Sequence, residues 1–264
     1  MTAGLRAAPP ARRWRVQGVS VQGHSHLREG VECQDAYRHA TIASGHARVL
    51  AVADGAGSRA RSAEGATLAV GLATAILAER VASGAVPDTP DRWRALLDGA
   101  YREVVAAFGR ATARMGADAA AFAATLTAVV LAHPWVGVVG IGDGFVITRA
   151  DGHDGRETFD LVSFSDPAGE YANETVFLSS PGALDSVAID CLHDPCLTAI
   201  MLATDGLAPA ALRRDRGRPR PNRSLVQGVF GAADDPTGIA RFLLEDRISA
   251  LSGDDKTLLL AVAE

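Results

Sequence analysis

The order of the elements that the sequence predicts indicates an α+β fold, in which layers of helix cover β-sheet. Strand patterns come first, two consecutive helices follow, and a further series of strands precedes one helix and a closing strand. Strictly alternating strands and helices would instead favour a parallel α/β sheet. The 264 residues suffice for one hydrophobic core, and no linker long enough to separate two domains is visible. We therefore expect a flexible tail over residues 1–13 and a single domain over 14–264.

Three strand patterns open the domain. Residues 14–21 alternate apolar and polar side chains, which is typical of a half-buried strand, and residues 37–42 are a candidate for its hairpin partner. Residues 48–53 are almost continuously apolar, as expected of a strand covered on both faces. Further strand patterns cover residues 125–132, 135–141, 145–149, 159–164, 187–191, 197–203 and 257–262.

Three helices are predicted from apolar residues at helical spacing. Residues 62–83 form the first, which Ser62 could cap, and Pro90 suits the first position of the second, which includes Phe108. Asp235 and Pro236 are expected to open a third helix that extends to Leu251.

The charge balance argues against nucleic acid as a main partner. The chain has 31 acidic and 26 basic residues, a net charge of −5, whereas binding a phosphate backbone requires a basic face. Residues 213–223 are an exception, with six arginines and two prolines. We expect a solvated, mobile loop there, and binding of an acidic partner, a phosphopeptide or RNA is the alternative.

Cysteine usage and hydropathy predict a cytoplasmic location without a membrane partner. The three cysteines include no CxxC pair, which favours a reducing compartment and offers no zinc site. The first residues lack the apolar core of a signal peptide. No continuous apolar run reaches the roughly 20 residues that a membrane span needs.

Carboxylates mark the tips of four apolar strands. Asp54, Asp143 and Asp205 each end an apolar run and precede a glycine, and Asp254 comes just before the last strand. A single Asp-Gly after a strand is a common hairpin signal, which suits Asp143 in particular. Four such sites together instead favour a cluster at one sheet edge, where the carboxylates would repel one another unless a cation neutralised them.

The type of ligand indicates the type of metal. Carboxylate oxygens without histidine or thiolate favour Mg²⁺ or Mn²⁺ over zinc. Gly55, directly after Asp54, allows close backbone approach, and its carbonyl can serve as a further ligand. Two such ions about 3.5–4 Å apart could hold a hydroxide and a phosphoryl oxygen together. The implied chemistry is in-line hydrolysis of a phosphate ester.

Short motifs across nearly the whole chain, in the family's order, resemble the metal-dependent protein phosphatases of type 2C. Another segment, GEYANETVFL (169–178), resembles an atypical bacterial branch. The resemblance implies an αββα sandwich of two antiparallel sheets flanked by helices, with the metals in a cleft at one end. The motifs are ECQDAY (32–37), VADGAGS (52–58), AATLTAVVL (123–131), GIGDG (140–144), LATDGL (202–207) and DDKTLLLAV (254–262).

The resemblance also implies roles for the residues that match these motifs. Asp54 would bridge two metal ions, and the Gly55 carbonyl would bind one of them. Asp205 and Asp254 would complete the ligands of the first ion. Asp35 would support the second ion through water.

Other positions match the family's pattern less closely. Asp143 would be a ligand for a weaker third ion, and Asp255, where the family often has asparagine, would lie behind the ligands. The family usually grips the substrate phosphate with an arginine upstream of the first motif. Arg28 and His26 are the candidates for that role here, although neither aligns cleanly.

Three departures from the family's pattern leave a second function open, and one of them is the lack of a clear phosphate-binding arginine. Gln34 stands where the family commonly has glutamate, and Ala56 replaces a histidine proposed as general acid in some members. The first hypothesis is hydrolysis of phosphoserine and phosphothreonine in proteins by a metal-bound hydroxide, opposing a serine/threonine kinase. The alternative is a non-catalytic pseudophosphatase that binds a phosphorylated or regulatory partner. A phosphatase for a small metabolite is a third hypothesis.

Overall fold

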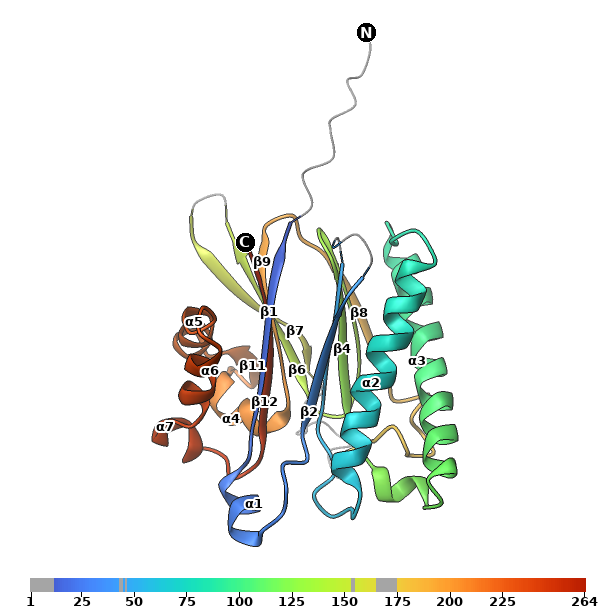
Figure 1. Cartoon of the computed structure of the whole chain (residues 1–264). Coiled ribbons are helices and arrows are strands. Elements are labelled where there is room, and N and C mark those ends of the chain that lie inside the picture. The colour runs from blue at the N-terminus through green and yellow to red at the C-terminus, as the bar shows by residue number, and fades with distance from the viewer. Residues whose placement is uncertain (1–11, 43–44, 46, 153–154, 165–174) are drawn as a thin grey trace.

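Two antiparallel β-sheets of five strands each lie face to face at the centre of the molecule, and helices cover both outer faces (Figure 1). The computed structural model describes residues 12–42, 45, 47–152, 155–164 and 175–264. The expected α+β class and the four-layer αββα sandwich are therefore confirmed. The expected tail, residues 1–13, lies outside the described residues except at its last two positions.

Strands distant in sequence pair within each sheet. The first sheet has the order β1–β12–β9–β6–β7, which joins the first and last strands of the chain, and the second has the order β2–β3–β4–β5–β8. The first sheet consists of β1 (Trp14–Val21), β6 (Phe145–Asp151), β7 (Glu157–Phe164), β9 (Leu197–Ala203) and β12 (Lys256–Ala263). The second consists of β2 (Ala36–Thr41), β3 (Arg48–Ala53), β4 (Leu126–Ala132), β5 (Trp135–Ile141) and β8 (Ala188–His193).

The helices are divided between the two outer faces. The long helices α2 (Ser62–Ala82) and α3 (Pro90–Arg114) cover the second sheet, and the short helices after β9 cover the first (Figure 1). Helix α1 (His24–Glu29) lies at one end of the sandwich. The covering helices of the first sheet are α4 (Ala208–Ala211), α5 (Arg223–Gly231), α6 (Pro236–Leu243) and α7 (Asp246–Ser249).

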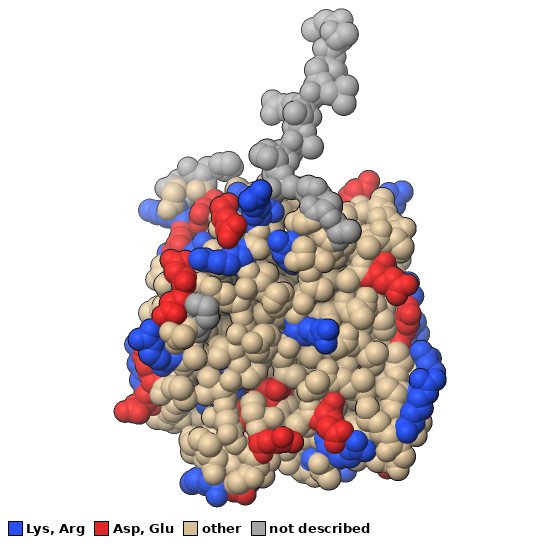
Figure 2. Space-filling view, viewed as in Figure 1, with Lys and Arg blue, Asp and Glu red and all other residues tan. Residues whose placement is uncertain are grey.

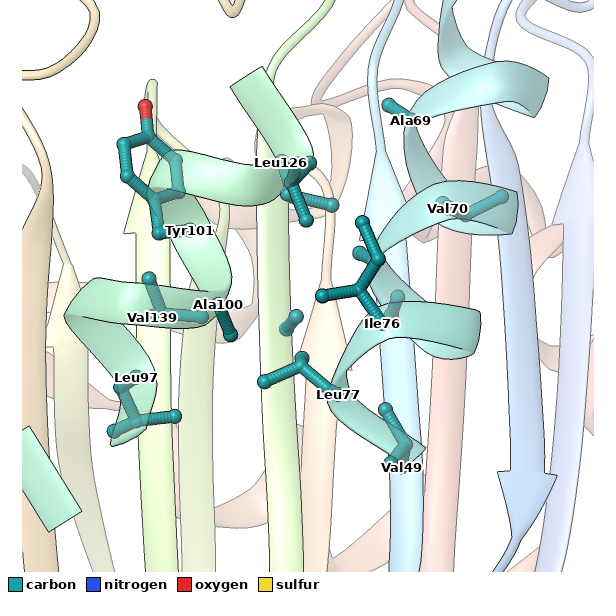
Figure 3. Close-up of a cluster of buried hydrophobic side chains, with 14 of the residues drawn as sticks. Val49, Ala69, Val70, Ile76, Leu77, Leu97, Ala100, Tyr101, Leu126 and Val139 are labelled. Atoms are coloured by element: carbon teal, nitrogen blue, oxygen red, sulfur yellow. The ribbon is translucent and has the colours of Figure 1, made fainter. Parts of the chain in front are cut away.

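Three hydrophobic clusters lie between the four layers and pack them together. The one between the sheets contains Leu50 and Val129 from the second sheet and Leu202 from the first, all fully buried. Figure 3 shows part of the cluster under the long helices, where Leu77 of α2 and Leu97 of α3 lie over the second sheet. Because both faces of the central strands are covered, β4 is buried along its whole length. This explains the continuously apolar strand patterns in the sequence.

Most predicted elements are present within one or two residues of their expected bounds, but the predicted pairing of the first strands is wrong. Strand β2 does not form a hairpin with β1; it pairs with β3 in the other sheet. The hairpin suggested at Asp143 is also absent, because β5 and β6 belong to different sheets. The chain crosses between the sheets there, and Gly142 has a φ of 91°.

The helices differ from the prediction in several places. Ser62 is the first helical residue and does not cap α2, which begins after Arg61 without a side-chain cap. The predicted third helix ends at Leu243, and α7 follows it as a separate turn. None of the three predicted helices corresponds to α1, α4 or α5.

The arginine-rich segment is not a loop. It begins with an antiparallel hairpin of β10 (Leu212–Asp215) and β11 (Arg218–Pro221), which leads into α5. The arginines in the hairpin are exposed, so the expected contact with solvent holds although the expected lack of structure does not.

Helix α2 is long and apolar enough to cross a membrane by length and composition alone. However, 50% of its most apolar window is buried inside the protein. The buried residues, which include Val70 and Leu77, belong to the cluster that α2 shares with α3 and the second sheet. The apolar character of α2 is therefore explained by its place in the core.

Candidate metal centre

Strands from both sheets bring carboxylates to the same end of the sandwich. Asp54 follows β3 and Asp205 follows β9, whereas Asp254 lies just before β12, which runs antiparallel to β9. Asp35 precedes β2, whose first residue pairs with the last residue of β3, so Asp35 lies beside Asp54. Asp143 lies in the crossing between β5 and β6. Acidic side chains are visible at this lower end of the molecule in Figure 2.

The carboxylates are close enough to share a cation. One carboxylate oxygen each from Asp54, Asp143 and Asp205 lies within 4.8 Å of the others. The side chains of Asp54 and Asp35 are near enough for each to influence the pKa of the other. Asp254 is near enough to raise the pKa of Asp54, Asp143 and Asp205. We call Asp35, Asp54, Asp143, Asp205 and Asp254 the carboxylate cluster.

Burial and mutual repulsion both disfavour the charged forms of Asp54 and Asp205. Burial raises the pKa of Asp205 to about 7, and the nearby carboxylates of Asp143 and Asp254 add to the rise. Burial also raises the pKa of Asp54, to which the charges of Asp35 and Asp205 contribute. Divalent cations would supply the missing positive charge, and oxygen ligands of this kind suit Mg²⁺ or Mn²⁺. The donor set therefore fits the metal expected from the sequence.

Threonine hydroxyls fix the backbone and side chains of the cluster. Thr125 Oγ1 accepts a hydrogen bond from the Asp54 amide at 2.9 Å, and the Thr125 amide donates to the Asp54 carbonyl at 2.8 Å. Thr204 Oγ1 donates to Asp35 Oδ2 at 2.7 Å and accepts from the Thr257 amide at 3.0 Å. The sequence analysis did not single out these threonines. Thr125 lies in the motif AATLTAVVL, and Thr204 lies in LATDGL, next to Asp205.

Two glycines allow the close backbone contacts around the cluster. A Cβ atom on Gly55 would lie 2.7 Å from the carbonyl oxygen of Ser62 and 2.8 Å from that of Gln34. On Gly206, a Cβ would lie only 1.8 Å from the carbonyl oxygen of Asp255. A larger residue at either position would therefore push apart the segments that hold the carboxylates.

Asp255 joins the start of the domain to its end. Its carboxylate is buried and accepts hydrogen bonds from the backbone amides of Gly23 at 2.7 Å and Gln34 at 2.6 Å. His26 Nδ1 lies 2.9 Å from Asp255 Oδ2, although the angle is not that of a hydrogen bond. Asp255 thus organises the loops around the cluster, and its expected place behind the ligands stays a prediction.

The two candidates for phosphate binding have different surroundings. His26 in α1 faces Asp255 and lies within 4.8 Å of carboxylate oxygens of both Asp254 and Asp255. Arg28, in the last turn of α1, is exposed. None of the contacts among the described residues connects Arg28 to the carboxylate cluster, so its role stays a prediction.

The lone lysine of the chain supports the loop that carries Asp254. Lys256 is 3% exposed, and its Nζ donates to the carbonyls of Ser252 at 3.0 Å and Asp254 at 2.9 Å. The sequence analysis did not single it out. Its position directly after the last acidic motif was the signal that could have marked it.

The segment resembling an atypical bacterial branch reaches the cluster at its described end. Residues 169–174 lie outside the described residues, but Thr175 Oγ1 donates a hydrogen bond to Asp143 Oδ2 at 3.3 Å. Asp143 and Asp205 also line a hollow of about 390 Å³ beside the hairpin β10–β11. The cluster is therefore open to a ligand from this side.

The fold and the site together define a class of protein, an αββα sandwich of two facing sheets with a cluster of carboxylates at one end that suits divalent metal ions. Within this class, the family model described as protein phosphatase 2C matches residues 22–243. The chain belongs to the protein phosphatase 2C family. This confirms both the family and the enzyme class, a protein phosphatase, that the sequence motifs indicated.

Individual relatives agree with this assignment. Serine/threonine-protein phosphatase 3 of Escherichia coli (strain K12) is 28% identical over 268 residues, which cover 94% of this chain and 98% of the relative. The serine-threonine phosphatase 2C of Toxoplasma gondii has the same fold, with a TM-score of 0.65, 14% identity and coverage of 98% of this chain and 96% of that one. The catalytic domain of the phosphatase PstP, solved with two manganese ions, gives a TM-score of 0.63 at 20% identity, covering 96% of this chain and 99% of that domain.

The raised pKa of Asp205 predicts how the effect of metal depends on pH. Because this pKa rises from 3.8 to about 7 on folding, the metal-free folded protein binds more protons than the unfolded chain between these values. The free energy of unfolding of the metal-free protein should therefore fall as pH increases through this window. Metal ions replace those protons, so thermal unfolding should show a larger increase in Tm with Mn²⁺, relative to chelator, at about pH 8 than at about pH 5. An equal Tm increase at both values would contradict the assignment.

The contacts of Asp255 predict a structural cost for its removal. Asp255→Ala leaves the buried amides of Gly23 and Gln34 without their acceptor, so the free energy of unfolding should fall by about 2–4 kcal/mol. Urea unfolding of the metal-free protein measures this loss. Asp190→Asn, at an exposed position in β8, is the control and should change stability by less than about 0.5 kcal/mol. A cost for Asp255→Ala no larger than that of the control would show that the residue does not organise these loops.

Proposed function

We propose that this chain hydrolyses phosphoserine and phosphothreonine in proteins with the help of Mn²⁺ or Mg²⁺. The observation that carries the proposal is the convergence of Asp54, Asp143 and Asp205, with ligand atoms within 4.8 Å of one another, in a protein phosphatase 2C chain. The names of the Escherichia coli relative and of PstP specify serine/threonine phosphatases, which supports the choice of substrate residue.

The geometry suggests a division of labour within the carboxylate cluster. The pKa of Asp54 is raised by the charges of both Asp35 and Asp205, so Asp54 lies near the proposed ligands of both ions. Such a position suits a ligand that two ions share. Asp205 and Asp254 would complete the ligands of one ion, and the Gly55 carbonyl is a further donor. Asp35 is held by Thr204 and would support the second ion through water.

The remaining residues would serve the phosphate and a weaker ion. Asp143, at the edge of the hollow, is the candidate ligand for a third ion. Bound divalent ions would lower the pKa of a water ligand, which makes it a nucleophile at neutral pH, and would neutralise the phosphoryl oxygens. His26 and Arg28 stay candidates for contact with the substrate phosphate, and His26 is the nearer of the two to the cluster.

The cellular setting follows from the substrate. A phosphatase for phosphorylated serine and threonine would oppose a serine/threonine kinase and find its substrates in the cytoplasm. The three cysteines are free and half-buried, which agrees with a reducing compartment.

Removing a central carboxylate should abolish activity without unfolding the protein. Asp54→Asn and Asp205→Asn should each lower manganese-dependent hydrolysis of a phosphothreonine peptide by about 100-fold or more, since each weakens metal binding that contributes several kcal/mol to catalysis. Stability in chelator should be kept or increased, because the amide removes a repelling charge.

Asp190→Asn serves as the matched control, since it makes the same chemical change at an exposed position in β8. It should retain the wild-type rate. Wild-type rates for both Asp54→Asn and Asp205→Asn with manganese present would show that the site is assigned to the wrong residues.

The alternative is a binding module without catalysis, and Gln34 is the observation that favours it. This residue is 7% exposed and stands beside the cluster as a neutral side chain where the family commonly has glutamate. Its backbone carbonyl accepts a hydrogen bond from Gly55, so its position is fixed next to the proposed second ion.

Calorimetric titration with Mn²⁺ separates the two functions. Two bound ions per chain are expected for the enzyme, because the carboxylates for both are gathered. One ion or none, together with tight binding of a phosphothreonine peptide and no release of phosphate, would favour the binding module. Gln34→Glu should then increase the number of ions bound.

A further inference from the structure

The hairpin β10–β11 carries a concentration of positive charge that the proposed reaction does not use. Arg213 and Arg214 lie on β10, Arg216 is in the turn, and Arg218 and Arg220 lie on β11. All five side chains are exposed. Asp215 is the one acidic residue in this hairpin, in a chain whose net charge is −5. The hairpin therefore differs in charge from the protein as a whole.

The register of the hairpin places like charges together. Arg213 lies directly opposite Arg220, whereas Asp215 lies opposite Arg218. Like charges in directly opposed positions destabilise a pair of strands, so the Arg213–Arg220 pair is unfavourable for the hairpin alone. An anion between or beside the two guanidinium groups would relieve that repulsion.

The same hairpin forms one wall of the hollow that contains part of the carboxylate cluster. This hollow, of about 390 Å³, is lined by the acidic residues Asp143 and Asp205 and by the basic residues Arg213 and Arg214. Its remaining lining is apolar: Ala208, Pro209, Leu212 and Pro219. A ligand at the proposed metal ions would therefore extend over an apolar surface toward the arginines.

Positive charge continues along the hairpin beyond this hollow. Two further hollows of about 370 Å³ each are lined by Arg218 and Arg220, one of them together with Asp160 and the other with Asp215 and Arg216. The arginines therefore extend along the hairpin beyond the hollow that contains Asp143 and Asp205. An extended chain with its phosphorylated residue at the cluster could follow them.

We propose that the β10–β11 hairpin is a subsite for an acidic side chain, carboxylate or phosphate, that flanks the phosphorylated residue of a protein substrate, with Arg213 as its contact. The inference rests on the proposed function, because it places the phosphorylated residue at the carboxylate cluster. The substrate class is then a phosphopeptide with acidic neighbours.

RNA suits this surface less well than an acidic peptide. A nucleic acid carries a phosphate at every nucleotide, so the part that entered the hollow would meet the carboxylates of Asp143 and Asp205. A peptide can instead place an anionic group beside the arginines and neutral groups over the apolar residues. The hollow, which is lined by acidic, basic and apolar residues together, matches the peptide.

The test compares two phosphothreonine peptides that differ only in having aspartate or asparagine on either side of the phosphorylated residue. The wild-type protein with Mn²⁺ should hydrolyse the aspartate peptide with a kcat/KM about threefold higher, the size of effect that one exposed ion pair provides. The ratio should approach one in Arg213→Gln and at high salt, and it should fall below one in Arg213→Glu. Because Arg214 Nη1 donates to the Gly217 carbonyl in the turn, Arg214 is left unchanged.

A ratio of two substrates is insensitive to a partial loss of folded protein. Arg110→Glu makes the same charge reversal at an exposed position in α3, in the layer that covers the other sheet, and should keep the wild-type ratio. A wild-type ratio of one, or a ratio that Arg213→Glu leaves unchanged, would overturn the subsite.

Binding measurements keep this inference separate from the proposed function. Fluorescence anisotropy with the two labelled peptides on the Asp54→Asn protein should give the same preference in Kd. If the wild-type protein hydrolyses neither peptide, the proposed function fails, and equal Kd values would then overturn the subsite independently. A labelled single-stranded RNA that binds more tightly than the aspartate peptide, and is released by Arg213→Glu, would also overturn it.

Discussion

Electrostatic repulsion among closely spaced, half-buried carboxylates is the constraint on which the rest of this structure depends. Asp35, Asp54, Asp143, Asp205 and Asp254 approach one another at one end of the sandwich, and both burial and neighbouring charge raise the pKa of the first four. A fold would not keep such a cluster for stability alone, because replacing it with apolar side chains would remove the cost. Its presence is most simply explained by cations, and the surrounding contacts of Thr125, Thr204, Asp255 and Lys256 serve to hold the carboxylates in place against their repulsion.

The parts of the fold that the sequence predicted well are those set by local patterns. Strand β1 and strand β3 have the predicted bounds, because alternation and a continuous apolar run are direct signs of one or two covered faces. Pairing between strands depends on contacts distant in sequence, so the partner of β2 and the crossing at Asp143 could not be deduced in the same way. The short helices α1 and α5 have too few turns for a clear apolar period.

In the candidate site, too, the sequence indicated which residues to consider but not how they contact one another. The carboxylates were found because each one ends or precedes an apolar strand next to a recognisable motif. The supporting residues were missed, since Thr204 and Lys256 act through hydrogen bonds that only the folded chain reveals. The contact of His26 with Asp255 joins residues more than two hundred positions apart, and no local pattern could have indicated it. The sequence could not show that arginines of the hairpin line the same hollow as Asp143 and Asp205.

The origin of the carboxylates in two different sheets has a mechanical consequence. Asp35 and Asp54 adjoin strands of the second sheet, Asp205 and Asp254 adjoin strands of the first, and mainly apolar side chains such as Leu50 and Leu202 hold the sheets together. The hydrophobic effect that favours this contact is non-directional, whereas metal–ligand bonds require defined distances. Any slip of one sheet over the other would change the spacing between the two groups of oxygen atoms. Ions bound by both groups would hold the two sheets in a fixed alignment. Binding of metal at the carboxylate cluster would then be coupled to the alignment of the whole sandwich.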